Sequence, residues 1–209
     1  MKKPLAVVRI NHEYDARLLE ELATEAIKPF NGVFEFDGVE PAVAKVTFEP
    51  PPGENGLYGW VANAIRQRFV ISNPNRYVLL VMPHPMMNEG GEPNPGLGGQ
   101  NVALISTAED YMNPADRRRF LHYAGRVAAH EFGHMFPFEL EHHERPVRTA
   151  AGKDCLMYVG RGVGDKVALD KMGMTFCGNC DYQIKARGRT FGLLGTFEAK
   201  TRNAGRYRI

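Results

Sequence analysis

The sequence predicts an α+β fold, in which strands with packed helices are followed by a small C-terminal subdomain. Strand-length apolar runs alternate with amphipathic helical patterns over the first half of the chain. A longer amphipathic helix follows between Asn113 and Pro137, and most candidate metal ligands come after it. We therefore expect an N-terminal subdomain at residues 1–136 and a C-terminal subdomain at residues 137–209.

The elements of the first half follow from the spacing of their apolar residues. Apolar recurrence every three to four residues predicts helices from Leu18 to Ile27, ending before Pro29, and from Leu57 to Phe69. Residues 83–99 are rich in Pro, Gly and Asn and are expected to form a loop, of a length that is often functional. Apolar runs predict strands at residues 4–10, 77–82 and 100–107, and alternation at residues 33–36 and 42–48 predicts a further strand region.

The central helix is expected to begin at Asn113, a favoured N-cap, with Pro114 in the first helical position. Its end is expected before Pro137, because the residue that precedes a proline is disfavoured in the α region. The positions that share its inward face are Phe120, Tyr123, Ala124, Val127, Glu131 and His134.

The C-terminal end of this helix carries the pattern H-E-x-x-H. His130 and His134 lie four residues apart, so their imidazoles project from the same face of the helix. With Glu131 between them, the pattern is typical of a zinc site that has its own general base. A catalytic zinc usually has three protein ligands, so a third is expected after the helix. The candidates there are Glu139, Glu141, His142 and His143.

Three cysteines follow, Cys155 and the C-x-x-C pair Cys177 and Cys180. An odd number of cysteines fits no closed disulfide framework. Together with one spare histidine they complete a Cys3His set, which is typical of a structural zinc site. A redox role for the C-x-x-C pair is the alternative, but no thioredoxin-like βαβ pattern surrounds it. No secretory signal and no apolar stretch of about 18 residues is evident, so we expect a cytoplasmic protein.

These motifs resemble those of the archaemetzincins, a branch of the metzincin zinc peptidases. The family signature is H-E-x-x-H-x-x-G-x-x-H-C, followed by C-x-M and C-x-x-C. The matching residues are His130, Glu131, His134, Cys155, Met157, Cys177 and Cys180. The resemblance implies a metzincin-like twisted mixed β-sheet with a backing helix and an active-site helix in the N-terminal half, and a small C-terminal subdomain stapled by a structural zinc. It also implies two zinc ions (one catalytic and one structural), and Met157 in a Met-turn beneath the catalytic zinc.

The segment after the helix departs from the family signature. Pro137 takes the place of the family's Gly, and Leu140 takes the place of its third His. Seven residues separate His134 from His142, two more than in the signature. A two-residue insertion makes His142 the third catalytic ligand and His143 the fourth structural ligand. The two histidines can also be exchanged, and Glu139 or Glu141 remains an alternative.

The function that we predict is zinc-dependent hydrolysis of peptide bonds, with Glu131 accepting the proton of a zinc-activated water. The strand at residues 100–107 is expected to lie along the cleft rim and to pair with an extended peptide or protein substrate. We expect a monomer that uses neither a membrane nor nucleic acid. The alternative is a zinc-stapled binding module whose catalytic site has decayed, with a basic tail at residues 181–209.

Overall fold

A five-stranded mixed sheet is the main element of the computed structural model, which describes residues 3–30, 32–46, 57–73, 76–88, 92–135, 137–158 and 166–194. The strand order is β2-β1-β4-β7-β6, and neighbours run parallel except for β6, which is antiparallel to β7. Two short parallel strands, β3 and β5, form a separate pair. The strands are β1 (Lys3–Arg9), β2 (Phe34–Val39), β3 (Leu57–Tyr58), β4 (Tyr77–Met82), β5 (Met86–Met87), β6 (Gly96–Gly99) and β7 (Val102–Ser106).

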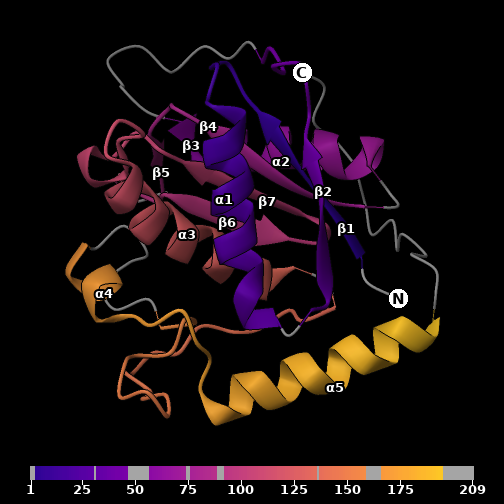
Figure 1. Cartoon of the computed structure of the whole chain (residues 1–209), viewed down its shortest axis with the longest axis vertical. Coiled ribbons are helices and arrows are strands. Elements are labelled where there is room, and N and C mark those ends of the chain that lie inside the picture. Colours follow the sequence, from indigo (N-terminus) through magenta and orange to yellow (C-terminus); the bar gives the residue numbers. More distant parts are fainter. Residues whose placement is uncertain are drawn as a thin grey trace.

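Helices cover both faces of this sheet. Helices α1 and α3 pack against each other and bury one face, while α2 buries the opposite face (Figure 1). The resemblance implied two helices in the N-terminal half; α1 and α3 take their places, and α2 is additional. No helix in the described residues is both long and apolar enough to cross a membrane. The helices are α1 (Ala16–Ile27), α2 (Gly59–Ser72), α3 (Arg117–His134), α4 (Lys166–Lys171) and α5 (Gly178–Leu194), with 3-10 turns at Lys28–Phe30 and Asp110–Met112.

The strands and helices expected from apolar spacing are confirmed for β1, α1, β2, α2, β4, β7 and α3, but two predictions are wrong. The strand expected at residues 42–48 is absent from its described part, which ends at residue 46. There Ala44 alone forms a bridge to Ile10. The loop expected at residues 83–99 contains β5 and β6. Because glycine has a low strand propensity and no side chain to reveal a period, the Gly-Leu-Gly-Gly sequence of β6 resembles a loop.

Strand β6 also changes the role expected for the strand at residues 100–107. That strand, β7, lies between β4 and β6 and is therefore internal. The edge of the sheet beside α3 is β6, and its glycines approach the helix closely. A Cβ atom added to Gly98 would lie 2.2 Å from the backbone oxygen of Glu131, so only glycine at this position lets the strand pack against the helix.

Helix α3 begins three residues later than its sequence suggests. Its N-cap is Asp116, whose side chain accepts a hydrogen bond from the backbone N–H of Arg119. Asn113 instead closes the preceding turn by accepting a hydrogen bond from the N–H of Ala115. Both residues have good capping side chains, and the turn between them decides which one is used. At the other end, α3 stops at His134 as expected, because Met135 is extended.

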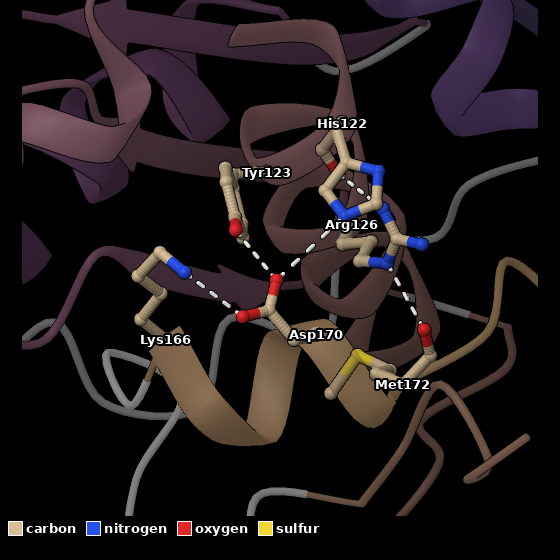
Figure 2. A network of polar contacts seen from close by, with 6 residues as sticks. All are labelled: His122, Tyr123, Arg126, Lys166, Asp170 and Met172. Atoms are coloured by element: carbon tan, nitrogen blue, oxygen red, sulfur yellow. Dashed lines mark hydrogen bonds and ion pairs between the residues drawn. The ribbon is translucent and has the colours of Figure 1, made fainter. Parts of the chain in front are cut away.

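The chain after α3 packs against the main core through aromatic residues and through α4. Helix α5 lies below the sheet and its covering helices (Figure 1). Figure 2 shows how α4 is attached to α3: the Tyr123 hydroxyl donates to Asp170 at 2.5 Å, and Arg126 Nε donates to the Met172 carbonyl at 3.0 Å. Lys166 pairs with the same aspartate at 2.9 Å. The subdomain boundary expected after residue 136 stays a prediction.

Candidate metal centres

Three histidine side chains converge at the end of α3. His130 and His134 project from successive turns of the helix, and their Nε2 atoms lie 3.1 Å apart. His142 comes from the segment after the helix. Its Nε2 atom lies 3.0 Å from the Nε2 atom of His130 and 2.7 Å from that of His134. Nitrogen atoms as close as this suit a common metal ion, because each imidazole has one lone pair to share.

Two backbone carbonyls orient the helical histidines. The Nδ1 atom of His130 lies 2.7 Å from the carbonyl oxygen of Leu156, and that of His134 lies 2.8 Å from the carbonyl oxygen of Leu140. A carbonyl oxygen can only accept a hydrogen bond, so each Nδ1 carries the proton and each Nε2 lone pair faces the cluster. The neutral rings are therefore held in the tautomer that a metal requires.

Burial keeps these imidazoles neutral at pH 7. Burial lowers the pKa of His130 well below its usual range, and the neighbouring imidazoles lower it further. The pKa of His134 falls to about 4, mainly through burial and then through His142. Burial also lowers the pKa of His142, as does the adjacent His143. Neutral imidazole is the form that binds metal, and a set of three nitrogen ligands is typical of catalytic zinc.

Glu131 lies between α3 and strand β6 and is 3% exposed. Burial raises the pKa of Glu131 to about 8, whereas a hydrogen bond from the N–H of Gly98 and the positive charge of Arg66 act in the opposite direction. A Cβ atom added to Gly96 would lie 2.3 Å from the Glu131 Oε1 atom. The carboxylate is therefore held against a strand that has no side chains on that face.

A second cluster joins His143 to the three cysteines. Their candidate ligand atoms all lie within 4.8 Å of one another. His143 Nε2 lies 3.4 Å from Cys177 Sγ and 3.2 Å from Cys180 Sγ. Hydrogen bonds from the Cys180 thiol and from the backbone N–H of Cys177 lower the pKa of Cys155 below the ordinary range of a thiol. A set of three sulfur atoms and one imidazole suits a closed tetrahedral zinc site.

The two clusters share short stretches of chain. His142 and His143 are adjacent, so one peptide unit serves both clusters. Cys155 belongs to the second cluster, and the next residue, Leu156, supplies the carbonyl that orients His130. Met157 is buried, and a Cβ atom added to Gly133 would lie 2.5 Å from its sulfur. Its sulfur thus packs against the helix between the two histidines, while the Met-turn role remains a prediction.

The tertiary arrangement separates the residues that the sequence left interchangeable. His142 lies with the helical histidines, and His143 lies with the cysteines. Glu139 and Glu141 are exposed and belong to neither cluster among the described residues. Sequence reasoning did not identify the orienting carbonyls of Leu140 and Leu156, for which side-chain identity gives no signal. It also missed the contact of the β6 glycines with Glu131. The available signal was that Gly96 and Gly98 are two residues apart, so that one face of a strand would carry no side chains there.

The comparisons with known proteins agree with this architecture. No protein-family model and no curated protein matches the sequence. Similar solved structures include the archaemetzincin of Methanopyrus kandleri, with a TM-score of 0.64 and 15% identity over 90% of this chain and 96% of that one. The malonate-bound archaemetzincin of Archaeoglobus fulgidus has a TM-score of 0.62 and 18% identity over 86% and 99%, respectively.

A third similar structure is the zinc-dependent peptidase of Methanocorpusculum labreanum. Its TM-score is 0.56, with 20% identity over 86% of this chain and 99% of that one. These likenesses span nearly the whole of each solved chain. The protein therefore has the archaemetzincin fold, as the motifs at residues 130–180 predicted.

Proposed function

We propose that the protein is a zinc-dependent metallopeptidase and a divergent archaemetzincin. The observation that carries this proposal is the convergence of three neutral imidazoles, from His130, His134 and His142, beside the buried carboxyl group of Glu131. The names of the structurally similar proteins support it, since they include archaemetzincins and a zinc-dependent peptidase.

In this proposal the three imidazoles hold the catalytic zinc. When bound, zinc supplies Lewis-acid chemistry, which activates a water molecule and polarises a peptide carbonyl. Glu131 accepts the proton of the attacking water and delivers it to the departing amine. With zinc held by the three imidazoles, the Glu131 carboxyl group would be favoured in the ionised form that a base requires, over the neutral form that burial favours.

The second cluster is proposed to hold a structural zinc ion. His143, Cys155, Cys177 and Cys180 fill all four positions of a tetrahedral site, so no position remains for a substrate. Such a site would fix the chain at His143 and at Cys155. Both points adjoin groups that define the first cluster, namely His142 and the carbonyl of Leu156.

The proposed substrate is a peptide or protein segment in an extended conformation. Strand β6 is an edge strand, with β7 as its neighbour on one side and no partner strand on the other among the described residues. Edge strands bind extended peptides by adding a strand through main-chain hydrogen bonds. Because Gly96 and Gly98 also contact Glu131, a peptide paired with β6 would pass near the proposed base.

Replacement of the proposed base tests the function. We expect Glu131→Gln to retain zinc and to hydrolyse peptides about 100-fold more slowly or worse, because proton transfer by a positioned base contributes rate factors of about 100 to 10,000. Glu141→Gln is the matched control, since it replaces an exposed carboxylate beyond the helix and should leave the rate unchanged. Hydrolysis at the wild-type rate by Glu131→Gln would exclude the proposed mechanism.

The binding-module alternative makes a different prediction about metal content. It requires zinc at the cysteine cluster alone, whereas the peptidase requires two ions per chain. Zinc content measured on the purified full chain separates them. Of the basic tail that motivated the alternative, residues 181–194 lie in α5, and residues 195–209 lie outside the described residues.

A further inference from the structure

A buried arginine, Arg66, lies behind the edge strand on the face of the sheet opposite α3. It projects from α2 and is 8% exposed. Its Nη1 atom donates a hydrogen bond of 2.7 Å to the carbonyl oxygen of Gly99. Its Nε and Nη2 atoms both donate to Asn63 Oδ1, at 3.3 and 3.0 Å. The guanidinium is thus fixed from its own helix and directed at the end of β6.

Strand β6 receives contacts from both faces of the sheet at adjacent residues. A Cβ atom added to Gly99 would lie 3.1 Å from Arg66 Nη1, and one added to Gly98 would lie 2.2 Å from the backbone oxygen of Glu131. The glycines leave no side chain between the arginine and α3. A displacement of the strand at Gly99 is therefore transmitted directly to Gly98, whose N–H donates to the Glu131 carboxylate.

The cost of burying a charge argues against a purely space-filling role for this arginine. A guanidinium removed from water loses its hydration, and an apolar side chain of similar length would fill the same space without that loss. Through its hydrogen bond to Gly99, Arg66 is linked to Gly98 and so to Glu131 on the opposite face of the strand. The residue thus connects α2, the edge strand and the proposed base in one set of contacts.

We propose that Arg66 is a positioning residue of the peptidase, which holds β6 at Gly99 so that the Gly98 N–H keeps the Glu131 carboxylate in its working orientation. This inference rests on the proposed function. It concerns a residue that belongs to neither the histidine cluster nor the cysteine cluster, and whose hydrogen bonds go to Asn63 and Gly99. Its effect should therefore appear in the rate of reaction and leave the metal content unchanged.

The experiment compares Arg66→Met, Arg66→Lys and the matched control Arg68→Met, which removes an exposed arginine two residues further along α2. Each full-length variant is loaded with zinc and measured for zinc content, kcat and KM on a peptide, and hydrogen–deuterium exchange of the peptide that contains residues 96–99. We expect Arg66→Met to bind zinc as the wild type does and to lose kcat by about tenfold or more, the size of one lost charge-assisted hydrogen bond.

The conservative variant separates positioning from a general effect on folding. We expect Arg66→Lys to recover part of the lost kcat, because its ammonium group can still donate to the Gly99 carbonyl. Residues 96–99 should exchange faster in Arg66→Met than in Arg66→Lys, with Arg68→Met like the wild type. If Arg66→Met does not fold, Arg66→Lys carries the test, with a lowered kcat at unchanged zinc content as the expected result.

Several results would overturn the inference. One is an unchanged kcat in folded, zinc-loaded Arg66→Met. Another is a loss of kcat in Arg68→Met as large as that in Arg66→Met. A third is an equal loss of kcat in the two Arg66 variants that is explained by the fraction of folded protein alone. If the wild type hydrolyses no peptide, the proposed function fails. Exchange at residues 96–99 then still decides whether Arg66 positions the strand, since unchanged exchange in Arg66→Met excludes it.

Discussion

The contact between Gly98 and α3 gives the sharpest prediction for this structure. In Gly98→Ala, the added Cβ atom would lie 2.2 Å from the backbone oxygen of Glu131, 2.9 Å from its carbonyl carbon and 3.0 Å from its Cα atom. Ordinary contact begins at 3.4 Å, and the helix backbone cannot swing aside as a flexible side chain can. The edge strand must therefore move away from α3 by more than an ångström.

This displacement should affect activity more than folding. Overpacking typically costs about 1–3 kcal/mol, so the melting temperature should fall by several degrees. The same movement withdraws the Gly98 N–H from the Glu131 carboxylate, and a misplacement of about 1 Å can lower a rate about 100-fold. Zinc content should stay at the wild-type level, because the carbonyls that orient His130 and His134 belong to Leu156 and Leu140, outside β6. Peptide hydrolysis, thermal unfolding and metal analysis of one preparation measure all three effects.

Gly125→Ala is the matched control for this substitution. Gly125 lies in α3, the helix that carries Glu131, and its added Cβ atom would meet nothing closer than Glu25 Cβ at 3.9 Å. Alanine in a helix interior is more stable than glycine by about 1 kcal/mol, so this variant should be slightly stabilised and fully active. A Gly98→Ala variant with the hydrolysis rate of Gly125→Ala would refute the reasoning that β6 positions the proposed base.

Two further predictions concern the second cluster and the core. Cys177→Ser should lower the zinc content by one ion per chain. A thousandfold loss of zinc affinity would lower the free energy of unfolding by about 4 kcal/mol. An unchanged zinc content would contradict the assignment of this cluster. Burial raises the pKa of Tyr14 from 10.0 to about 12, so above pH 10 the unfolded chain loses a proton that the folded chain keeps, and stability should fall by up to about 3 kcal/mol by pH 12. Urea unfolding of Tyr14→Phe should lack this part of the alkaline loss, and a pH dependence identical to the wild type would contradict it.

The errors in the sequence-based fold have a common physical origin. Strand β6 was missed because its pairing with β7 uses backbone groups, while its closeness to α3 requires glycine, the residue that otherwise marks a loop. The N-cap was placed at Asn113 because Asn113 and Asp116 have similar capping propensity. Backbone packing against α3 decides the first case, and the turn between Asn113 and Asp116 decides the second. Local residue preferences encode neither.

The sequence by itself determined the helix that carries His130, Glu131 and His134, because hydrophobic period and ligand spacing are local properties. It also determined the set of histidines and cysteines available as ligands. The tertiary structure decided which ligand joins which cluster, since His142 and His143 are adjacent and equal in chemistry but point to different sites. It likewise decided that an edge strand of glycines, held by Arg66 from the opposite face, lies against the proposed base. Such contacts join residues distant in the chain, and only the folded arrangement of the backbone brings them together.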